Sequence, residues 1–88
     1  MTKEELHEVY MQGLKNQEKE LEELATCLEI GLMDSLIHGI RKGISTQCQS
    51  EEKKVMSYLK NKFSKYPVKV KNERWINTTY YWLVYTGD

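Results

Sequence analysis

Apolar side chains recur along the first 40 residues with the spacing of an amphipathic helix. Thr2 and Glu5 form a capping box just before the first apolar positions, and such a box satisfies free backbone N–H groups at a helix N-terminus. Most of the residues that follow are Glu, Leu, Lys and Gln, which favour helices. The pattern predicts a helix over residues 3–42, and Gly13 and Gly31 are the positions where we expect any bend or break.

A seam with heptad spacing runs along this helix. Its apolar members are Tyr10, Leu14, Leu21, Leu24 and Leu28. Gln17 interrupts the seam, and the apolar stripe widens only beyond residue 24. A continuous helix of this length would span about 60 Å, which is longer than a compact 88-residue domain needs. We therefore expect its N-terminal half to pair with a second copy through the seam. In the alternative, this half folds back as a separate helix within a monomer.

The middle of the chain predicts a helix end, a short strand and a second helix. A basic last turn and a glycine form the predicted stop signal, at Arg41, Lys42 and Gly43. Ile44, Thr46 and Cys48 then alternate with polar residues, which predicts a strand with these three side chains inward. Ser50 is the predicted cap of the second helix, which ends before Pro67. The buried stripe of that helix is predicted to be Val55, Met56, Leu59 and Phe63.

Two further strands are predicted at the C-terminal end. Residues 68–71 alternate valine and lysine, as in a strand with one buried face. Residues 79–86 are rich in β-branched and aromatic side chains, which favour strands. Both faces of the last strand are apolar or aromatic, with Tyr81, Leu83 and Tyr85 on one and Tyr80, Trp82 and Val84 on the other. We expect this strand to be central in a sheet or covered on both sides.

The order of elements predicts an α+β fold in a single domain, residues 1–88. A long N-terminal helix, within residues 1–42, precedes a β-α-β-β unit over residues 44–88. We expect a small three-stranded sheet covered by helices, with a right-handed β-α-β crossover and a C-terminal hairpin. The alternative lacks the first strand and leaves a helical hairpin plus a C-terminal β-hairpin, as in winged-helix domains.

Composition and charge limit the partners. The chain has 13 basic and 13 acidic residues, so its formal net charge is zero. This zero combines nine acids and three lysines in residues 1–34 with eight bases and one acid in residues 53–74. Opposite charge in two segments predicts interaction surfaces. No apolar run reaches the length of a membrane span, and the acidic N-terminus is unlike a signal peptide, so we expect a cytoplasmic protein with no membrane partner.

The sequence predicts no enzyme, no metal site and no cofactor. It contains none of the common catalytic or nucleotide-binding motifs. Its two cysteines and two histidines, Cys27, Cys48, His7 and His38, lack the close pairing of zinc ligands. Cys48 lies between a strand and a helix, where a reactive thiol could form, but no base stands beside it in the sequence.

Two surfaces are candidates for binding a macromolecule. Candidates for a protein partner are the acidic and aromatic side chains Glu20, Glu22, Glu23, Tyr80 and Trp82. The basic segment 53–74 is the alternative, because lysines contact phosphates and aromatic rings stack on bases. Its candidates for nucleic-acid binding are Lys60, Lys62, Lys65, Lys69, Lys71, Arg74 and Trp75.

The chain resembles small phage and prophage proteins. The resemblance rests on the stretches LIHGIRKGISTQCQSEEKKVMSYLKNKFSKYPVKV and YYWLVY, within residues 30–86. These proteins share an amphipathic helix that ends at a glycine, a short strand, a second helix, and a β-hairpin with aromatic residues. The resemblance implies a cytoplasmic accessory protein, often one that binds a host protein, and it carries over no functional residue.

Three functions follow as hypotheses. The first is a small non-enzymatic, phage-encoded interaction protein that forms a homo-oligomer and inhibits or modulates a host macromolecule. The second is a nucleic-acid-binding protein that uses the basic segment. The third is an oligomer that sequesters a small nucleotide signal.

Overall fold

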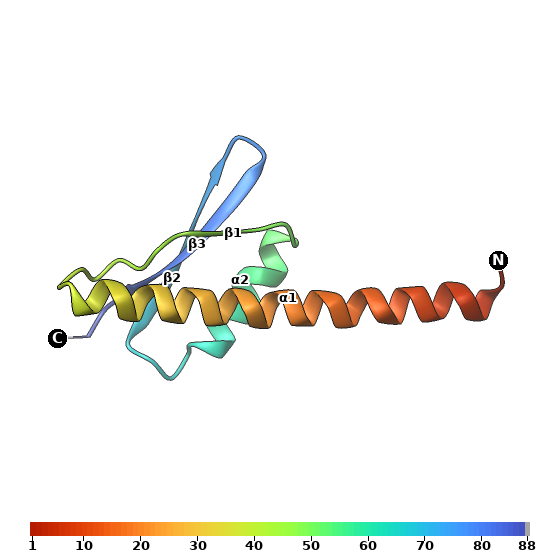
Figure 1. Ribbon diagram of the computed structural model, residues 1–88, viewed down its shortest axis with the longest axis horizontal. Coiled ribbons are helices and arrows are strands. Elements are labelled where there is room, and N and C mark those ends of the chain that lie inside the picture. Colours follow the sequence, from red (N-terminus) through yellow and green to blue (C-terminus); the bar gives the residue numbers. More distant parts are fainter. Residues whose placement is uncertain (88) are drawn as a thin grey trace.

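A long straight helix and a small sheet dominate the computed structural model, which describes residues 1–87 (Figure 1). The elements are α1 (Lys3–Ile37), β1 (Thr46–Cys48), α2 (Glu52–Lys62), β2 (Val68–Trp75) and β3 (Thr78–Tyr85). The α+β prediction is therefore confirmed, including the short first strand on which the two alternative layouts differed.

Strand β3 lies at the centre of the three-stranded sheet, as predicted, in the order β1-β3-β2. It runs antiparallel to both neighbours, so β1 and β2 are parallel to each other but do not touch. The crossover through α2 therefore joins two parallel strands between which β3 is inserted. This central position explains why β3 carries the most β-branched and aromatic side chains in the chain.

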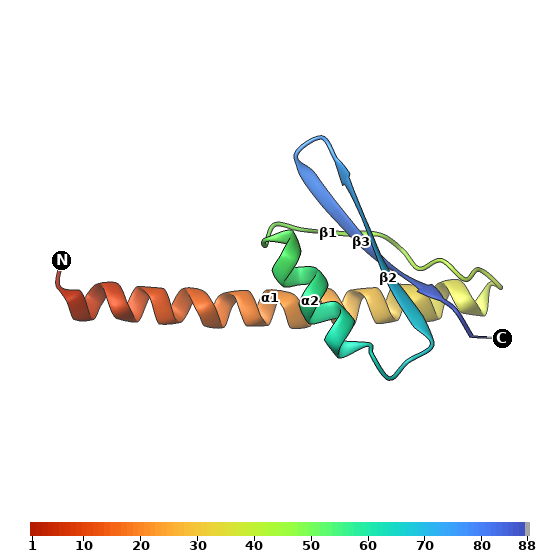
Figure 2. The same cartoon turned by 180° about the vertical axis from the view of Figure 1, so that it is seen from behind.

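Both helices pack against one face of the sheet (Figures 1 and 2). We call this the inner face. In the register of the sheet, Val70 lies opposite Leu83 and Thr46 lies opposite Tyr81, so these side chains are on the inner face. They form one core with the helices, made of Leu24, Ala25, Leu28, Leu32, Cys48, Val55, Leu59, Phe63, Val70, Tyr81 and Leu83. The outer face, by contrast, carries half-buried and exposed side chains and is open to solvent.

Helix α1 ends earlier than predicted, at Ile37 rather than at residue 42. Gly39 has a φ of +77°, which favours glycine, and it forms a left-handed cap. The N–H of Ile40 donates to the carbonyl of Ser35 at 2.9 Å, and the N–H of Gly39 donates to Leu36 at 3.0 Å. These two bonds form a Schellman motif, so Gly39 and not Gly43 ends the helix. Within α1 the helix is continuous through both other glycines.

Residues 41–43 are extended and lengthen the edge of the sheet. The N–H of Gly43 donates to the carbonyl of Leu83 at 2.7 Å, and Lys42 pairs with Val84. The next pairing along this edge is that of Thr46 with Tyr81. Between the two pairings, residues 43–45 of the edge lie opposite residues 82–83 of β3, and the one extra residue is a β-bulge. At the bulge the Ile44 side chain faces α1, because a Cβ added to Gly31 would lie 3.1 Å from the Cβ of Ile44. Ile44 therefore lies on the predicted side of the sheet, but at this edge its side chain is 55% exposed.

The junction between β1 and α2 is tied to α1. Ser50 is not the helix cap: Glu51 holds that position and makes no side-chain cap hydrogen bond. The hydroxyl of Ser50 instead donates to a carboxylate oxygen of Glu20 at 3.1 Å, and the thiol of Cys48 donates to the other oxygen at 3.4 Å. In the predicted buried stripe of the second helix, Val55 and Leu59 are buried, as is Phe63, which directly follows α2. Met56 is only half-buried.

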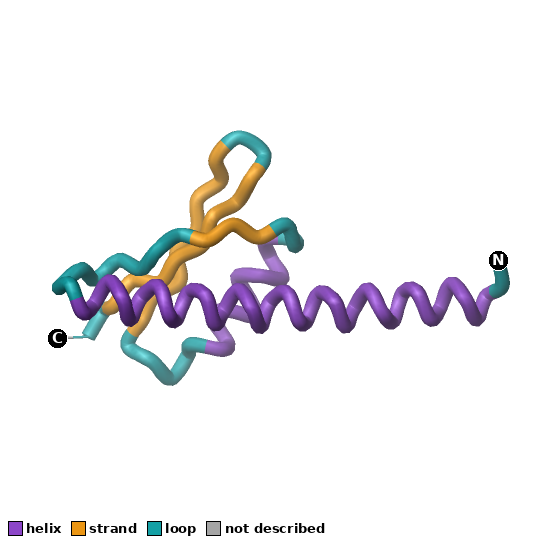
Figure 3. The backbone as a smooth tube through the Cα atoms, viewed as in Figure 1, coloured by secondary structure: helices purple, strands orange, loops and turns teal. Residues whose placement is uncertain are grey.

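The N-terminal half of α1 projects away from the core (Figures 2 and 3). The molecule measures 56 × 30 × 19 Å. Its radius of gyration is 15.5 Å, against about 12 Å for a compact domain of this length. In residues 1–20 only Leu14 and Glu20 are partly buried. The long extension that the sequence predicts is therefore present as one continuous helix.

Candidate functional site

The outer face of the sheet gathers aromatic and basic side chains. Alternation along the strands directs Lys69 and Lys71 of β2 to this face, together with Tyr80 and Trp82 of β3. Lys71 pairs directly with Trp82, and Glu73 pairs with Tyr80. Side chains directly opposite one another in an antiparallel pair are close enough to interact, so these residues form one surface. We call it the outer sheet face.

A shallow hollow lies on the outer sheet face. It has a volume of about 300 Å³ and is lined by Lys42, Ser45, Glu73, Trp75, Tyr80 and Trp82. The ammonium of Lys42 lies 4.8 Å from the centre of the Trp82 ring, which is a cation–π contact. Trp75 stands at the end of β2 and is 64% exposed, so its ring is the most accessible of the three aromatic rings. The hollow thus combines aromatic surfaces with one ammonium and one carboxylate.

The electrostatics of this face favour an anion. Lys42, Lys69 and Lys71 provide three positive charges, against the one carboxylate of Glu73. The pKa of Lys71 is lowered, first because its ammonium is within hydrogen-bonding reach of Lys69 and then because the charge of Lys69 repels it. Such repulsion is relieved when an anion binds between two lysines. The acidic helix α1 packs on the inner face, so its carboxylates lie on the other side of the sheet.

The structure brings together residues that the sequence assigned to two different surfaces. Tyr80 and Trp82 were candidates for a protein partner, whereas Lys69, Lys71 and Trp75 were candidates for nucleic acid, and all five share the outer sheet face. The β pairing of β2 with β3 joins them. Sequence reasoning missed Lys42, which was assigned to the first helix, and Glu73, which lies beyond the predicted strand over residues 68–71.

The other predicted nucleic-acid residues lie elsewhere. Lys60 and Lys62 are in the last turn of α2, and Lys65 follows in the loop before β2. Arg74 belongs to β2 but alternates to the opposite side from Lys71. The basic segment is therefore not a single surface, because a helix, a loop and a strand direct its charges differently.

The predicted acidic surface is also divided. Glu20 is half-buried and accepts hydrogen bonds from Cys48 and Ser50, so its carboxylate is occupied within the chain. Glu22 and Glu23 are exposed on α1.

The residues of the predicted heptad seam lie partly in the core and partly on the projecting half of α1. Leu24 and Leu28 are 5% and 0% exposed in this chain's own core, so they have no free surface for a second copy. Tyr10 is exposed, and Leu14 and Leu21 are partly buried.

The thiol of Cys48 is not arranged as a nucleophile. The side chain is buried, and burial raises its pKa above the ordinary value. The thiol donates to Glu20, whose negative charge also disfavours a thiolate. Cys27 is exposed. Among residues 1–87, no three His, Cys, Asp or Glu side chains are grouped as metal ligands.

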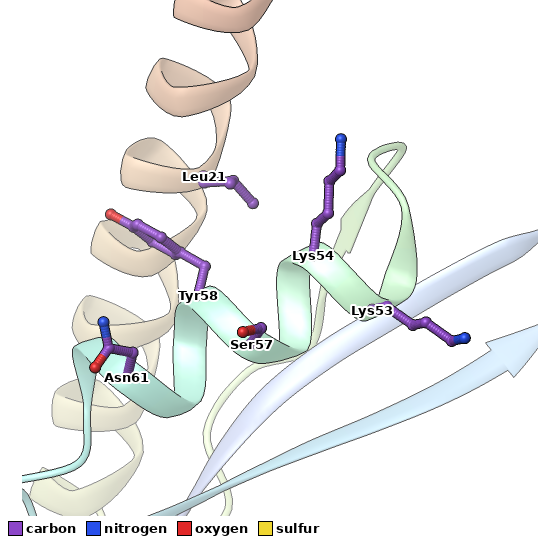
Figure 4. Close-up of a pocket in the computed structure, with 6 residues that line it drawn as sticks. All are labelled: Leu21, Lys53, Lys54, Ser57, Tyr58 and Asn61. Carbon is purple, nitrogen blue, oxygen red and sulfur yellow. The ribbon is translucent and has the colours of Figure 1, made fainter.

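A second hollow lies between the two helices (Figure 4). It has a volume of about 770 Å³ and is lined by Leu21, Lys53, Lys54, Ser57, Tyr58 and Asn61. In Figure 4, Leu21 points from α1 towards α2, and Lys54 extends along α1 towards its projecting half. We call this site the interhelix groove. It opens where α1 leaves the core.

Comparisons with known proteins do not assign a function. The chain matches no protein-family model, no curated protein and no solved structure. Within residues 1–87, neither helix combines the length and apolar character that crossing a membrane requires.

Proposed function

We propose that this protein is a non-enzymatic binding protein whose outer sheet face binds single-stranded nucleic acid. One observation carries the proposal: three aromatic rings and three lysines from separate segments share one open face. Single-strand binders combine a positive surface that follows the backbone with aromatic rings on which bases stack.

The hollow provides a reason for each kind of contact. A base stacked on Trp75 or Tyr80 would bury two apolar faces against each other. The carboxylate of Glu73 can accept a hydrogen bond from the amino group of a base. Lys69 and Lys71 lie along the neighbouring strand, where the phosphates that flank a stacked base would pass.

A single strand fits this face better than a duplex. Bases in a duplex are already stacked on one another, so aromatic rings on a sheet gain little from meeting them. A cationic ligand is disfavoured because Lys42 already lies over the Trp82 ring. An acidic protein segment is the competing occupant of the same face, and the experiment below separates it from nucleic acid.

Binding is tested by fluorescence anisotropy with labelled single-stranded DNA and RNA of mixed sequence. We expect dissociation constants of about 1–100 µM at physiological salt, tighter at low salt. Trp75→Ala should weaken binding about 5- to 150-fold because the stacking surface is removed. Tyr66→Ala is the matched control, because Tyr66 is also an exposed aromatic residue (58%) but lies in the loop before β2.

Charge is tested with a second matched pair. Lys69→Gln with Lys71→Gln should weaken binding and reduce the slope of log affinity against log salt by about 0.7 for each phosphate that is no longer neutralised. Lys62→Gln with Lys65→Gln removes the same charge from the end of α2 and the loop that follows, outside the hollow that Lys60 shares with Lys69, and should leave the slope unchanged. No binding at low salt, or equal weakening by both pairs, would exclude the outer sheet face as the nucleic-acid site. Capture of an acidic protein by the same face in that case would favour the competing occupant.

A further inference from the structure

We propose that two copies of this chain pair antiparallel through the projecting halves of α1, and that the N-terminus of each copy docks in the interhelix groove of the other. This inference concerns α1 and α2, so it is independent of the outer sheet face.

The projecting helix has an apolar face without a partner in its own chain. Tyr10 precedes Leu28 by 18 residues, which is five full turns, so both side chains point to the same side of α1. At Leu28 that side is fully buried by the core, whereas Tyr10 is 63% exposed and Leu6 is 54% exposed. Most of the stability of a helix in a protein comes from burying its apolar face, and the projecting half of α1 buries almost none of its own within the chain.

The position of the core determines the orientation of the pair. The seam faces the chain's own α2 and sheet in the C-terminal half of α1. In a parallel pair, two such cores would compete for the same space beside the same end of the helices. In an antiparallel pair, the cores lie at opposite ends, and the two bare halves face each other. With Tyr10 opposite Leu14 of the second copy, Lys3 of that copy lies level with Leu21.

The interhelix groove is suited to the end of the second helix. Leu21 and Tyr58 give it apolar surfaces, and Lys53 and Lys54 give it positive charge. Residues 3–8 of α1 carry Glu4, Glu5 and Glu8 against the single positive charge of Lys3, so this end of the helix has a net negative charge. An acidic helix end from the second copy therefore meets a basic groove, and two-fold symmetry makes the contact twice.

The first test is the molar mass in solution, measured by light scattering after size-exclusion chromatography. We expect twice the chain mass of 10.4 kDa. Leu14→Glu should raise the dimer dissociation constant about thirtyfold or more, as for a central interface residue. Ile30→Glu is the matched control: it adds the same charge to α1 at a residue that is 62% exposed, about 160° around the helix from Leu14. Circular dichroism verifies that both variants remain folded.

The second test is charge reversal across the groove. Lys53→Glu with Lys54→Glu should weaken the dimer, Glu4→Lys with Glu5→Lys should weaken it as well, and the combined variant should restore it. A monomeric wild-type protein, or a dimer equally tolerant of Leu14→Glu and Ile30→Glu, overturns the pairing. A dimer that is unaffected by charge reversal overturns the docking in the groove. Binding of oligonucleotides to the Leu14→Glu variant is measured in parallel, so failure of the dimer is distinguishable from failure of the outer sheet face.

Discussion

Replacing Tyr81 with phenylalanine is expected to stabilise the protein. The Tyr81 side chain is fully buried on the inner face of β3, and its hydroxyl has no hydrogen-bond partner among residues 1–87. A buried polar group without a partner costs about 1–3 kcal/mol, and phenylalanine removes it while keeping the ring. The total stability of an 88-residue domain is about 4–13 kcal/mol, so the change is measurable. Each kcal/mol raises the melting temperature by about 4–8 °C.

The same residue predicts a dependence on pH. Burial raises the pKa of Tyr81 to about 12, and the neighbouring Cys48 and Glu52 add to the effect through their negative charge, whereas the nearby Thr79 side chain lowers the pKa and offsets a small part of it. The unfolded chain loses this proton near pH 10, so between about pH 10 and 12 the unfolded state binds fewer protons than the folded state. Stability contributed by the neutral phenol is present below pH 10 and falls as the pH rises through this window. The phenylalanine variant should lack this part of the decrease.

Urea denaturation followed by circular dichroism, at pH 7 and at stepped pH values up to 11, measures both effects. Tyr80→Phe is the control, because Tyr80 is half-buried on the outer face and its replacement should change stability by less than about 0.5 kcal/mol. A Tyr81→Phe variant less stable than the wild type at pH 7 would mean that the hydroxyl is hydrogen-bonded, and the reasoning from an unpartnered phenol would then fail.

Three further predictions concern glycines and thiols. Gly43→Ala should destabilise the protein by about 1–3 kcal/mol in urea denaturation, because its Cβ would lie 3.1 Å from the carbonyl oxygen of Leu83 and 3.2 Å from the Cα of Leu32; no change would exclude this close approach. Gly39→Ala should cost about 1–2 kcal/mol through its positive φ alone, since no atom lies within 4 Å of the added Cβ, and an unchanged melting temperature would contradict the left-handed cap. A maleimide added to the native protein should label the exposed Cys27 before the buried Cys48, and mass spectrometry of peptides detects the order; equal rates would show that Cys48 is accessible.

Local patterns in the chain account for the helices, the strands and most of the core. A capping box and helical periodicity act between residues three or four apart, so they predict α1, which is observed from Lys3 onwards. The buried stripe of α2 and the central position of β3 follow equally from local alternation. The end of α1 was predicted at the wrong glycine, because Gly39 and Gly43 offer similar local signals and only the Schellman hydrogen bonds of Gly39 select between them.

The surfaces, in contrast, depend on contacts between distant segments. Lys42 reaches Trp82, and Ser50 reaches Glu20, across separations of 40 and 30 residues, and no local pattern encodes such contacts. Beside the one-residue bulge in the edge strand, Ile44 faces Gly31 of α1 but stays 55% exposed, and alternation alone does not predict this exposure. The outer sheet face exists only because β2 pairs with β3 in one register. This difference arises because a strand's side chains gain their neighbours from pairing with distant segments, whereas a helix forms from neighbours in the sequence.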